Sequence, residues 1–207
     1  GWVRVRVRGR RGSRIRLEYG ERLKPDGSVD RCNLRSAKAT DLYILKGEGE
    51  EEYAPRFTFH GFQYVQVFLE GGCALLSLRG ELVCNATRAA GSFECSDGEL
   101  NALHAMAETT ERNNQQGVLT DCPQRDERFG WLNDLSSRLY QTVYNCGMER
   151  FFPKFTRDIA DTQLKNGAIA DTAPYYTGGR PADPVCIAYV LMPALSYALY
   201  GDVRFVR

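Results

Sequence analysis

The spacing of apolar residues changes once along this chain, and this change constrains the fold more than any other feature. Up to about residue 88, short segments alternate between apolar and polar residues, the period of strands with one buried face. From about residue 96, apolar residues recur every three to four positions, the period of amphipathic helices. The sequence therefore predicts an antiparallel β-sandwich domain over residues 1–88, which need not be complete at its start, and a helical domain over residues 89–207.

The strand pattern is strictest at the beginning of the chain. Residues 2–8 place valines on one face and arginines on the other, and residues 14–19 alternate in the same way. Residues 10–13 form a turn between them, so we expect the two strands to make a hairpin. The acidic segment 47–52 is interpreted as a solvated turn. Further strands are predicted at three short ranges: 42–45, 56–59 and 62–67.

The helical region begins with a capping pattern. Ser96 and Glu99 stand three positions apart, as in a capping box, so Ser96 is predicted to be the N-cap of the first helix. Leu100, Leu103 and Ala107 would then lie on one face of that helix.

Three further helices are predicted from apolar periodicity and from helix breakers. One is expected over residues 134–146, and another from near Pro153, which suits a first helical turn. The last is expected over residues 184–200, ended by Gly201 and kinked at Pro193. Two long irregular segments separate these helices: 114–132 and 166–183. Their charged and aromatic residues favour a functional role, because long loops in compact domains are usually functional or disordered.

The composition limits the classes of function. Of 207 residues, 43% are hydrophobic and 26% are charged, which is ordinary for a globular protein. The net charge of +1 indicates neither a nucleic acid partner nor an anionic membrane surface. No apolar run approaches the roughly 20 residues that span a bilayer. With two histidines, a metal centre built on several histidines is excluded, and no cofactor is indicated.

The seven cysteines are odd in number and follow no disulfide framework, and no CxxC pair suggests zinc. Free thiols in a reducing compartment are the simplest interpretation, so we expect a cytoplasmic protein. Cys122 is interpreted as a structural thiol, because neither histidine lies near it in the sequence to act as a base. The chain starts at Gly1 with a strand already under way, and we expect it to be an internal piece of a longer protein.

One segment, residues 120–134, concentrates the chemistry of the chain. It contains four carboxylates, two arginines and one tryptophan beside a proline and a glycine. This density of charge next to an indole suits a polar pocket for a hydroxylated ligand, and it also suits a solvated loop. The charged residues are Asp121, Arg125, Asp126, Glu127, Arg128 and Asp134.

With these residues in place, the chain resembles the bacterial α-L-rhamnosidases of glycoside hydrolase family seventy-eight. The segment DCPQRDER at 121–128, followed by Gly130, Trp131 and Asp134, is similar to the catalytic-loop signature of that family. Other matching segments occur in the same order along almost the whole chain: 39–43, 55–65, 96–97, 112–114, 179–184 and 200–202. The resemblance implies a β-sandwich followed by the opening helices, about the first third, of a truncated (α/α)6 barrel.

The resemblance also implies a reaction and roles for residues. The family hydrolyses terminal α-L-rhamnosyl residues from glycosides or polysaccharides with inversion. Glu127 would be the general acid, and Asp121 and Arg125 would hydrogen-bond the sugar hydroxyls. Trp131 would face the sugar ring. Asp134 would be either another sugar ligand or the N-cap of the following helix. The family's general base lies far downstream, so we expect it beyond this chain and expect the chain alone to be inactive.

Several alternatives stay open at this point. Glu127 could be a surface glutamate paired with an arginine, and Trp131 could be a core residue. Tyr175 and Tyr176 suit sugar contacts or plain packing. Where many relatives have tryptophans, this chain has Cys186 and Ala194, which could alter specificity. The rival functions are a carbohydrate-binding module that does not cleave, a barrel glycosidase for another sugar, and a structural module without a ligand. The oligomeric state is not indicated.

Overall fold

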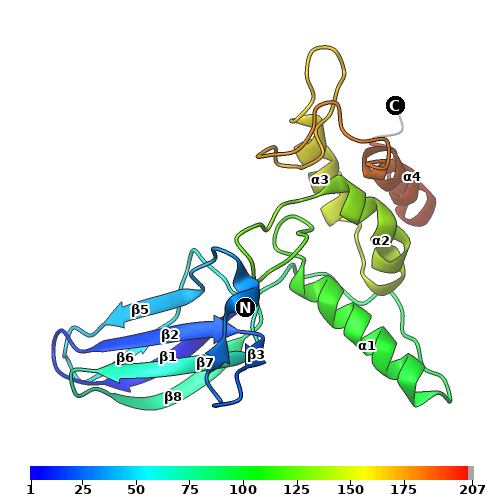
Figure 1. Cartoon of the computed structure of the whole chain (residues 1–207). Helices are drawn as coiled ribbons and strands as arrows, with labels where there is room; N and C mark the ends of the chain where they lie inside the picture. The colour runs from blue at the N-terminus through cyan, green and yellow to red at the C-terminus, as the bar shows by residue number, and fades with distance from the viewer. Residues whose placement is uncertain (205–207) are drawn as a thin grey trace. The chain divides into compact units, whose positions relative to one another are not determined.

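The computed structural model describes residues 1–204, which form two compact units (Figure 1). The first unit contains Gly1–Val83 together with Cys122–Arg128, and the second contains Cys84–Asp121 together with the residues from Phe129 onward. A short segment of the helical half of the sequence is therefore part of the unit that holds the strands. The domain boundary expected between residues 88 and 89 stays a prediction.

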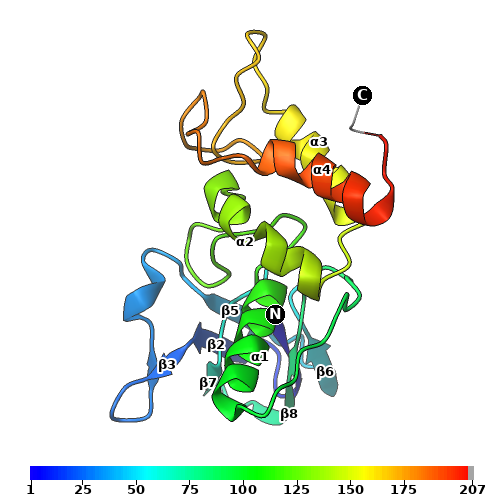
Figure 2. The same ribbon diagram turned by 90° about the vertical axis from the view of Figure 1, so that its right-hand side faces the viewer.

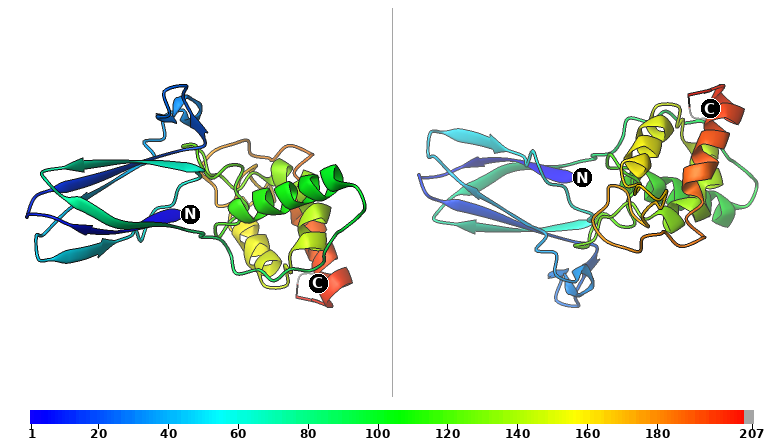
Figure 3. Two further views of the ribbon diagram at one scale, coloured as in Figure 1. Left: turned by 90° about the horizontal axis from the view of Figure 1, so that it is seen from below. Right: turned by 90° about the horizontal axis from the view of Figure 1, so that it is seen from above.

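The first unit is a sandwich of two antiparallel sheets, which confirms the predicted fold class for this half. Figure 3 views the two sheets as separate layers. One sheet has the strand order β6-β1-β8 and is made of Glu50–Tyr53, Trp2–Arg8 and Ala74–Glu81. The other has the order β5-β2-β7 and is made of Thr40–Ile44, Arg14–Gly20 and Tyr64–Glu70. A small third sheet pairs β3 (Arg22–Leu23) with β4 (Val29–Asp30).

The core of the sandwich lies between the two central strands. The valines of β1 and the apolar residues of β2 are buried almost completely and belong to one cluster: Val3, Val5, Val7, Ile15, Leu17 and Tyr19. Each fully buried aliphatic side chain of this kind contributes about 1.5–3 kcal/mol relative to an exposed one. The alternation in the sequence therefore predicted correctly which face of each strand is buried.

The predicted hairpin between the first two strands is wrong. β1 pairs with β6 and β8, whereas β2 pairs with β5 and β7, so the two strands lie in different sheets. The turn after β1 carries the chain from one sheet to the other. Alternation specifies which face of a strand is buried. It does not specify which strands are neighbours, because a hairpin in one sheet and two strands in facing sheets bury that face equally well.

The acidic segment is also different from the prediction, because its second half is a strand. Glu50 and Glu52 lie on β6 opposite the arginine face of β1, and the side chains of Arg4, Arg6 and Arg8 pair with them. Opposite charges directly across a strand pair support the register. The segment is therefore specified by its partner strand and not by its own composition.

Two further strand predictions need correction. Residues 56–59 form no strand among the residues that the structure describes, and β7 begins at Tyr64, two residues later than predicted. β8, Ala74–Glu81, was not predicted. Within residues 56–59 the Phe57 side chain is fully exposed, whereas the guanidinium of Arg128 lies over the Phe59 ring. The two aromatic side chains therefore do not share one face, as they would in a strand with one buried face.

The second unit contains the four predicted helices: α1 (Gly98–Asn113), α2 (Leu132–Asn145), α3 (Phe151–Ala160) and α4 (Ala188–Tyr200). α4 packs against both α2 and α3 (Figures 1 and 2). Their shared core contains Leu135, Leu139, Phe152, Phe155 and Met192. No helix in the described part of the chain is long and apolar enough to cross a membrane.

The ends of the helices show where capping patterns misled. The N-cap of α1 is Asp97 and not Ser96, because the Asp97 carboxylate accepts hydrogen bonds from the backbone N–H groups of Glu99 and Leu100. α4 starts four residues later than predicted but ends as expected at Gly201, whose φ of +67° is left-handed. Pro193 lies inside α4, as predicted.

Candidate active site

The segment Cys122–Arg128, here called the carboxylate loop, is held against residues of the sandwich that lie far from it in the sequence. A Cβ atom added at Gly61 would come within 2.9 Å of Pro123 Cγ and of the backbone nitrogen of Gln124, so the loop rests closely on this glycine. The guanidinium of Arg128 lies 4.4 Å from the centre of the Phe59 ring. Burial lowers the pKa of Arg128. Its φ of +61° lies in the left-handed region.

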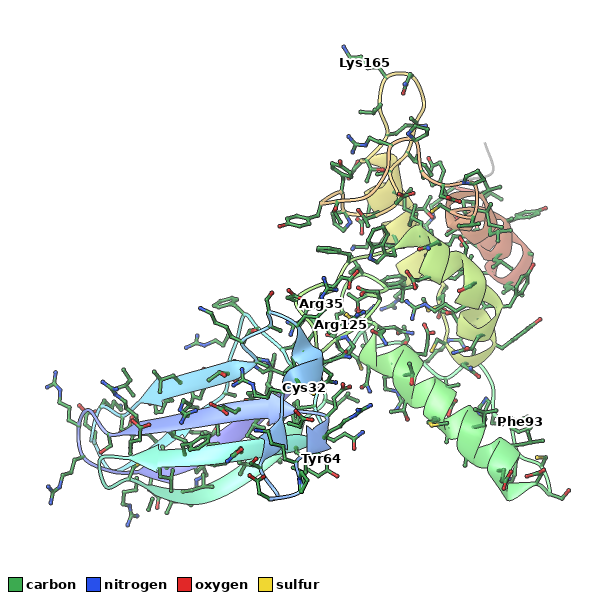
Figure 4. All side chains as sticks on the ribbon, in the orientation of Figure 1. Cys32, Arg35, Tyr64, Phe93, Arg125 and Lys165 are labelled. Carbon is green, nitrogen blue, oxygen red and sulfur yellow. The ribbon has the colours of Figure 1, made fainter. Side chains whose placement is uncertain are left out.

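Glu127, the predicted general acid, is contacted by two arginines. Arg35 Nη1 lies 2.6 Å from Glu127 Oε2, and Arg125 Nη2 lies 3.4 Å from the same oxygen. The Glu127 side chain is 19% exposed, which shields these ion pairs partly from water. Arg35 and Arg125 are labelled in Figure 4. Glu127 is thus paired with arginines, as one of the alternatives from the sequence proposed, but inside a closely packed loop.

Asp126, the neighbouring carboxylate, is contacted by two consecutive residues of the sandwich, Arg35 and Ser36. The hydroxyl of Ser36 donates a hydrogen bond to it, and Arg35 Nε lies 3.4 Å from its Oδ1. The hydrogen bond from Ser36 lowers the pKa of Asp126. Arg35 therefore contacts both carboxylates of the loop.

A buried polar network supports the segment on which the carboxylate loop rests. His60 Nε2 lies 3.0 Å from Asp41 Oδ1, the Tyr19 hydroxyl donates to Asp41 Oδ2 at 2.7 Å, and the rings of His60 and Tyr19 are stacked. Burial alone would raise the pKa of Asp41, but the hydrogen bonds from His60 and Tyr19 outweigh it and lower that pKa. His60 therefore serves packing and hydrogen bonding in this unit. His60 directly precedes Gly61, the glycine on which the carboxylate loop rests.

Asp121 lies in the second unit, where it pairs with Phe129. Its backbone N–H donates to the Phe129 carbonyl at 3.0 Å, and its carboxylate Oδ1 accepts from the Phe129 N–H at 2.8 Å. These two bonds tie together the residues that flank the carboxylate loop. Asp121 is partly buried.

Trp131 belongs to an aromatic group built from both irregular segments of the second unit. The Phe129 ring lies 6.3 Å from the Trp131 ring and 5.0 Å from the Tyr176 ring. The Leu132 N–H donates to the Asp171 carbonyl, which joins the two segments beside these rings. Trp131 is partly exposed and Tyr176 is 77% exposed, so Trp131 is not a fully buried core residue. Ring faces of this kind suit the apolar side of a sugar.

Asp134 is exposed in the first turn of α2. The N-cap of this helix is Trp131, so the interpretation of Asp134 as the N-cap is wrong. A carboxylate in the first turn is still favoured there by the helix dipole. Its role as a sugar ligand stays a prediction.

The second irregular segment is organised by the carboxylate of Asp171. Its Oδ2 accepts from the Gly179 N–H, its Oδ1 accepts from the Asp183 N–H at 2.8 Å, and the Cys186 thiol lies 3.6 Å away. Burial, together with Asp171, raises the pKa of Cys186 to about 11. Cys186 is therefore a buried neutral thiol. The nearby Tyr175 ring lies against the guanidinium of Arg180, at 3.9 Å.

The structure thus divides the predicted site residues between the two units. Arg125 and Glu127 are in contact in the first, whereas Asp121, Trp131 and Asp134 lie in the second. Sequence reasoning missed Arg35 and Ser36, because nothing in their local pattern distinguishes them from a solvated turn.

Comparison with known proteins identifies the family. Residues 1–75 match the concanavalin-like domain of bacterial α-L-rhamnosidases, and residues 88–207 match their six-hairpin glycosidase domain. This chain belongs to the bacterial α-L-rhamnosidase family. The α-L-rhamnosidase of Streptomyces avermitilis is 41% identical to it over 204 residues, which are 98% of this chain and 20% of that protein.

Solved structures of rhamnosidases show the same fold. The enzyme of Dictyoglumus thermophilum matches with a TM-score of 0.92 and 38% identity, over 98% of this chain and 23% of that chain. The Streptomyces avermitilis enzyme complexed with L-rhamnose matches with a TM-score of 0.89 and 40% identity, over 98% and 20%. The prediction of a β-sandwich followed by the opening helices of the barrel is confirmed. The chain spans about a fifth of the length of these rhamnosidases.

Proposed function

We propose that this chain is the part of an α-L-rhamnosidase that carries the general acid, Glu127, and the loops that first contact the sugar. The observation that carries the proposal is the carboxylate loop itself. Its carboxylate at position 127 is partly buried, contacted by Arg35 and Arg125, and held by residues far away in the sequence. A plain surface loop does not need such anchoring. Family membership supports the substrate, a terminal α-L-rhamnosyl residue of a glycoside or polysaccharide.

The proposed reaction is hydrolysis with inversion. Glu127 gives its proton to the glycosidic oxygen as the bond to the anomeric carbon breaks, and a general base takes a proton from the water that attacks the opposite face. Inverting enzymes hold these two carboxyl groups about 6.5–9.5 Å apart, which leaves room for the water. We place the base in the part of the rhamnosidase that this chain, a fifth of its relatives' length, does not cover. The chain alone is then inactive.

The two arginines place positive charge beside the carboxylate of Glu127. Such charges stabilise the negative charge that grows on Glu127 as it gives its proton to the glycosidic oxygen. In the proposed complex, Arg125 turns from Glu127 to the sugar hydroxyls, because its guanidinium is suited to neighbouring oxygens. Arg35 keeps its contact with the acid.

The other proposed sugar ligands lie in the second unit. The Asp121 carboxylate would accept hydrogen bonds from sugar hydroxyls. Trp131, supported by Phe129, would face the ring, and Asp134 would add a carboxylate from the exposed first turn of α2. These roles rest on the resemblance of the loop to the family signature.

The test is release of nitrophenol from an aryl α-L-rhamnoside, comparing this chain with a parent protein of its relatives' length. Activity in the parent alone, lost in Glu127→Gln, supports the proposal. NMR of the first product shows whether the anomeric configuration is inverted. Activity in the 207-residue chain would contradict the missing base. Binding without cleavage by the parent would favour a carbohydrate-binding module, and cleavage of a different aryl glycoside would favour another sugar.

A further inference from the structure

The structure shows the β-sandwich supplying a cation to the carboxylate loop. We propose that Arg35, on the turn after the 3-10 helix Cys32–Leu34, is a positioning residue for the acid Glu127. The inference rests on the proposed function of Glu127 and adds to it a residue of the sandwich, 92 positions earlier in the chain.

The contacts of Arg35 suit a role in orientation. Its Nη1 donates to Glu127 Oε2 at 2.6 Å, and its Nε lies 3.4 Å from Asp126 Oδ1. One planar guanidinium therefore bridges two successive carboxylates and restricts how they are oriented relative to each other. The Ser36 hydroxyl holds Asp126 from the same turn. The Glu127 side chain is less exposed than that of Arg35, at 19% against 54%, so the carboxylate is the inner partner of the pair.

The backbone of Arg35 is an independent indication. Its φ is +58° and its ψ is −123°, a conformation that glycine adopts readily and that side chains with a Cβ rarely adopt. Strained backbone of this kind persists where the surrounding structure requires it, and it concentrates at functional sites. Glycine would suit the turn better, so the presence of arginine is explained by its side chain, whose contacts are with Glu127 and Asp126.

Arg35 differs from the other arginine on Glu127 in where it is attached. Arg125 is two residues from Glu127 and moves with the carboxylate loop. Arg35 belongs to a turn of the sandwich, so it holds Glu127 in a position set by the sandwich. A mispositioned acid would slow proton transfer to the departing oxygen without weakening sugar binding.

This distinction predicts a dependence on the leaving group. A poor leaving group, such as the alkoxide of an alkyl rhamnoside, needs protonation by the acid as the bond breaks. An activated phenolate, such as dinitrophenolate, departs with little assistance. Loss of Arg35 should therefore slow the first substrate far more than the second, as loss of the acid itself does.

The experiment uses the parent protein with the variants Arg35→Gly, Arg35→Lys and Glu127→Gln, and with Arg22→Ala as a matched control. Arg22 is an exposed arginine of β3 in the same unit. For Arg35→Gly, we expect kcat on an alkyl α-L-rhamnoside to fall about 10- to 100-fold, below the full contribution of a general acid, and kcat on dinitrophenyl α-L-rhamnoside to fall less than about threefold. KM should change little. Tm should not fall, because glycine relieves the strained φ. Arg35→Lys should recover part of kcat, and Arg22→Ala should match the wild type.

Three results would overturn the inference: equal losses on both substrates, a loss that follows a fall in Tm, or wild-type kinetics for Arg35→Gly. In each of these cases Glu127→Gln still shows the leaving-group dependence, so the proposed function survives. If the wild-type parent cleaves neither rhamnoside, the proposed function fails first, and this inference fails with it.

Discussion

The carboxylate loop and the second irregular segment, which in the structure runs from 161 to 187 between α3 and α4, are both without helix or strand, yet they are held in different ways. The carboxylate loop depends on remote partners, since Arg35 and Gly61 belong to the sandwich. The second segment bonds through its backbone to Gly130 and Leu132 but is organised from within, since the carboxylate of Asp171 accepts from backbone amides of the same segment. Changes that disturb the carboxylate loop should therefore reduce activity by more than their effect on stability accounts for. Changes at Asp171 should make the second segment more mobile.

The largest expected effect tests the chemical half of this comparison. Glu127→Gln keeps the size of the side chain but removes the proton that an acid delivers. We expect kcat on an alkyl rhamnoside to fall about 10²- to 10⁴-fold in the parent protein, the usual contribution of a general acid, with little change in Tm. Thermal unfolding and steady-state kinetics on one preparation measure both. A loss of Tm that accounts for the loss of activity would contradict the comparison.

Gly61→Ala tests whether the remote support of the carboxylate loop matters. The new Cβ would meet Pro123 and Gln124 at 2.9 Å, so either the carboxylate loop or the backbone around Gly61 must shift. Overpacking of this kind costs about 1–3 kcal/mol of stability. We expect kcat to fall by more than this destabilisation accounts for, because the acid moves with the loop.

The matched control for Gly61→Ala is Gly80→Ala, where an added Cβ meets nothing within 4 Å. That variant should keep wild-type kcat. Equal effects of the two substitutions would show that the loop does not depend on its contact with Gly61.

Asp171→Ala tests whether this carboxylate organises the second irregular segment. It leaves the N–H groups of Gly179 and Asp183, which are exposed, to water instead of the carboxylate, at a cost of about 0.5–1.5 kcal/mol for each hydrogen bond lost. We expect proteolytic cleavage within residues 161–187 to become faster. Asp171→Asn keeps one acceptor oxygen and should show an intermediate rate. Unchanged proteolysis in both variants would mean that Asp171 does not organise the segment.

The smallest effect concerns pH. Hydrogen bonds from His60 and Tyr19 lower the pKa of Asp41 below its unfolded value of about 3.9. The unfolded chain then binds the proton more readily, so the stabilisation is complete above that value and is lost as pH falls through the lower folded pKa. Asp41→Asn should be less stable near neutral pH and lose less stability below about pH 4 than the wild type. Parallel acid-unfolding curves for the two proteins would contradict this assignment.

Much of the architecture could be predicted from the sequence, because it depends on neighbours a few residues apart. The valines of β1 and the leucines of α2 repeat with the periods of a strand and a helix, and their burial follows. Even here, small local choices were missed: Asp97 caps α1 in place of Ser96, since Asp and Ser are both favoured N-cap residues.

The candidate site was predicted less completely. Glu127, Arg125 and Asp121 stand in one short segment that resembles a family signature, so they could be proposed as site residues from the sequence. Arg35 stands 92 residues away on a turn with no pattern of its own, and only its φ of +58° and its contact with Glu127 distinguish it. Such a residue becomes visible once the fold brings the two segments together.

The sequence by itself determined which faces of β1 and β2 are buried, that four helices follow, and that the carboxylate loop resembles a family signature, because periodicity and motifs are local. The tertiary structure alone decided that β1 and β2 lie in different sheets, that an acidic segment pairs with an arginine face, and that the sandwich supplies Arg35 to Glu127. The physical reason is the same in each case. Strand partners and ion pairs between distant segments are chosen by the packing of the whole unit, where many alternatives bury the same local pattern equally well.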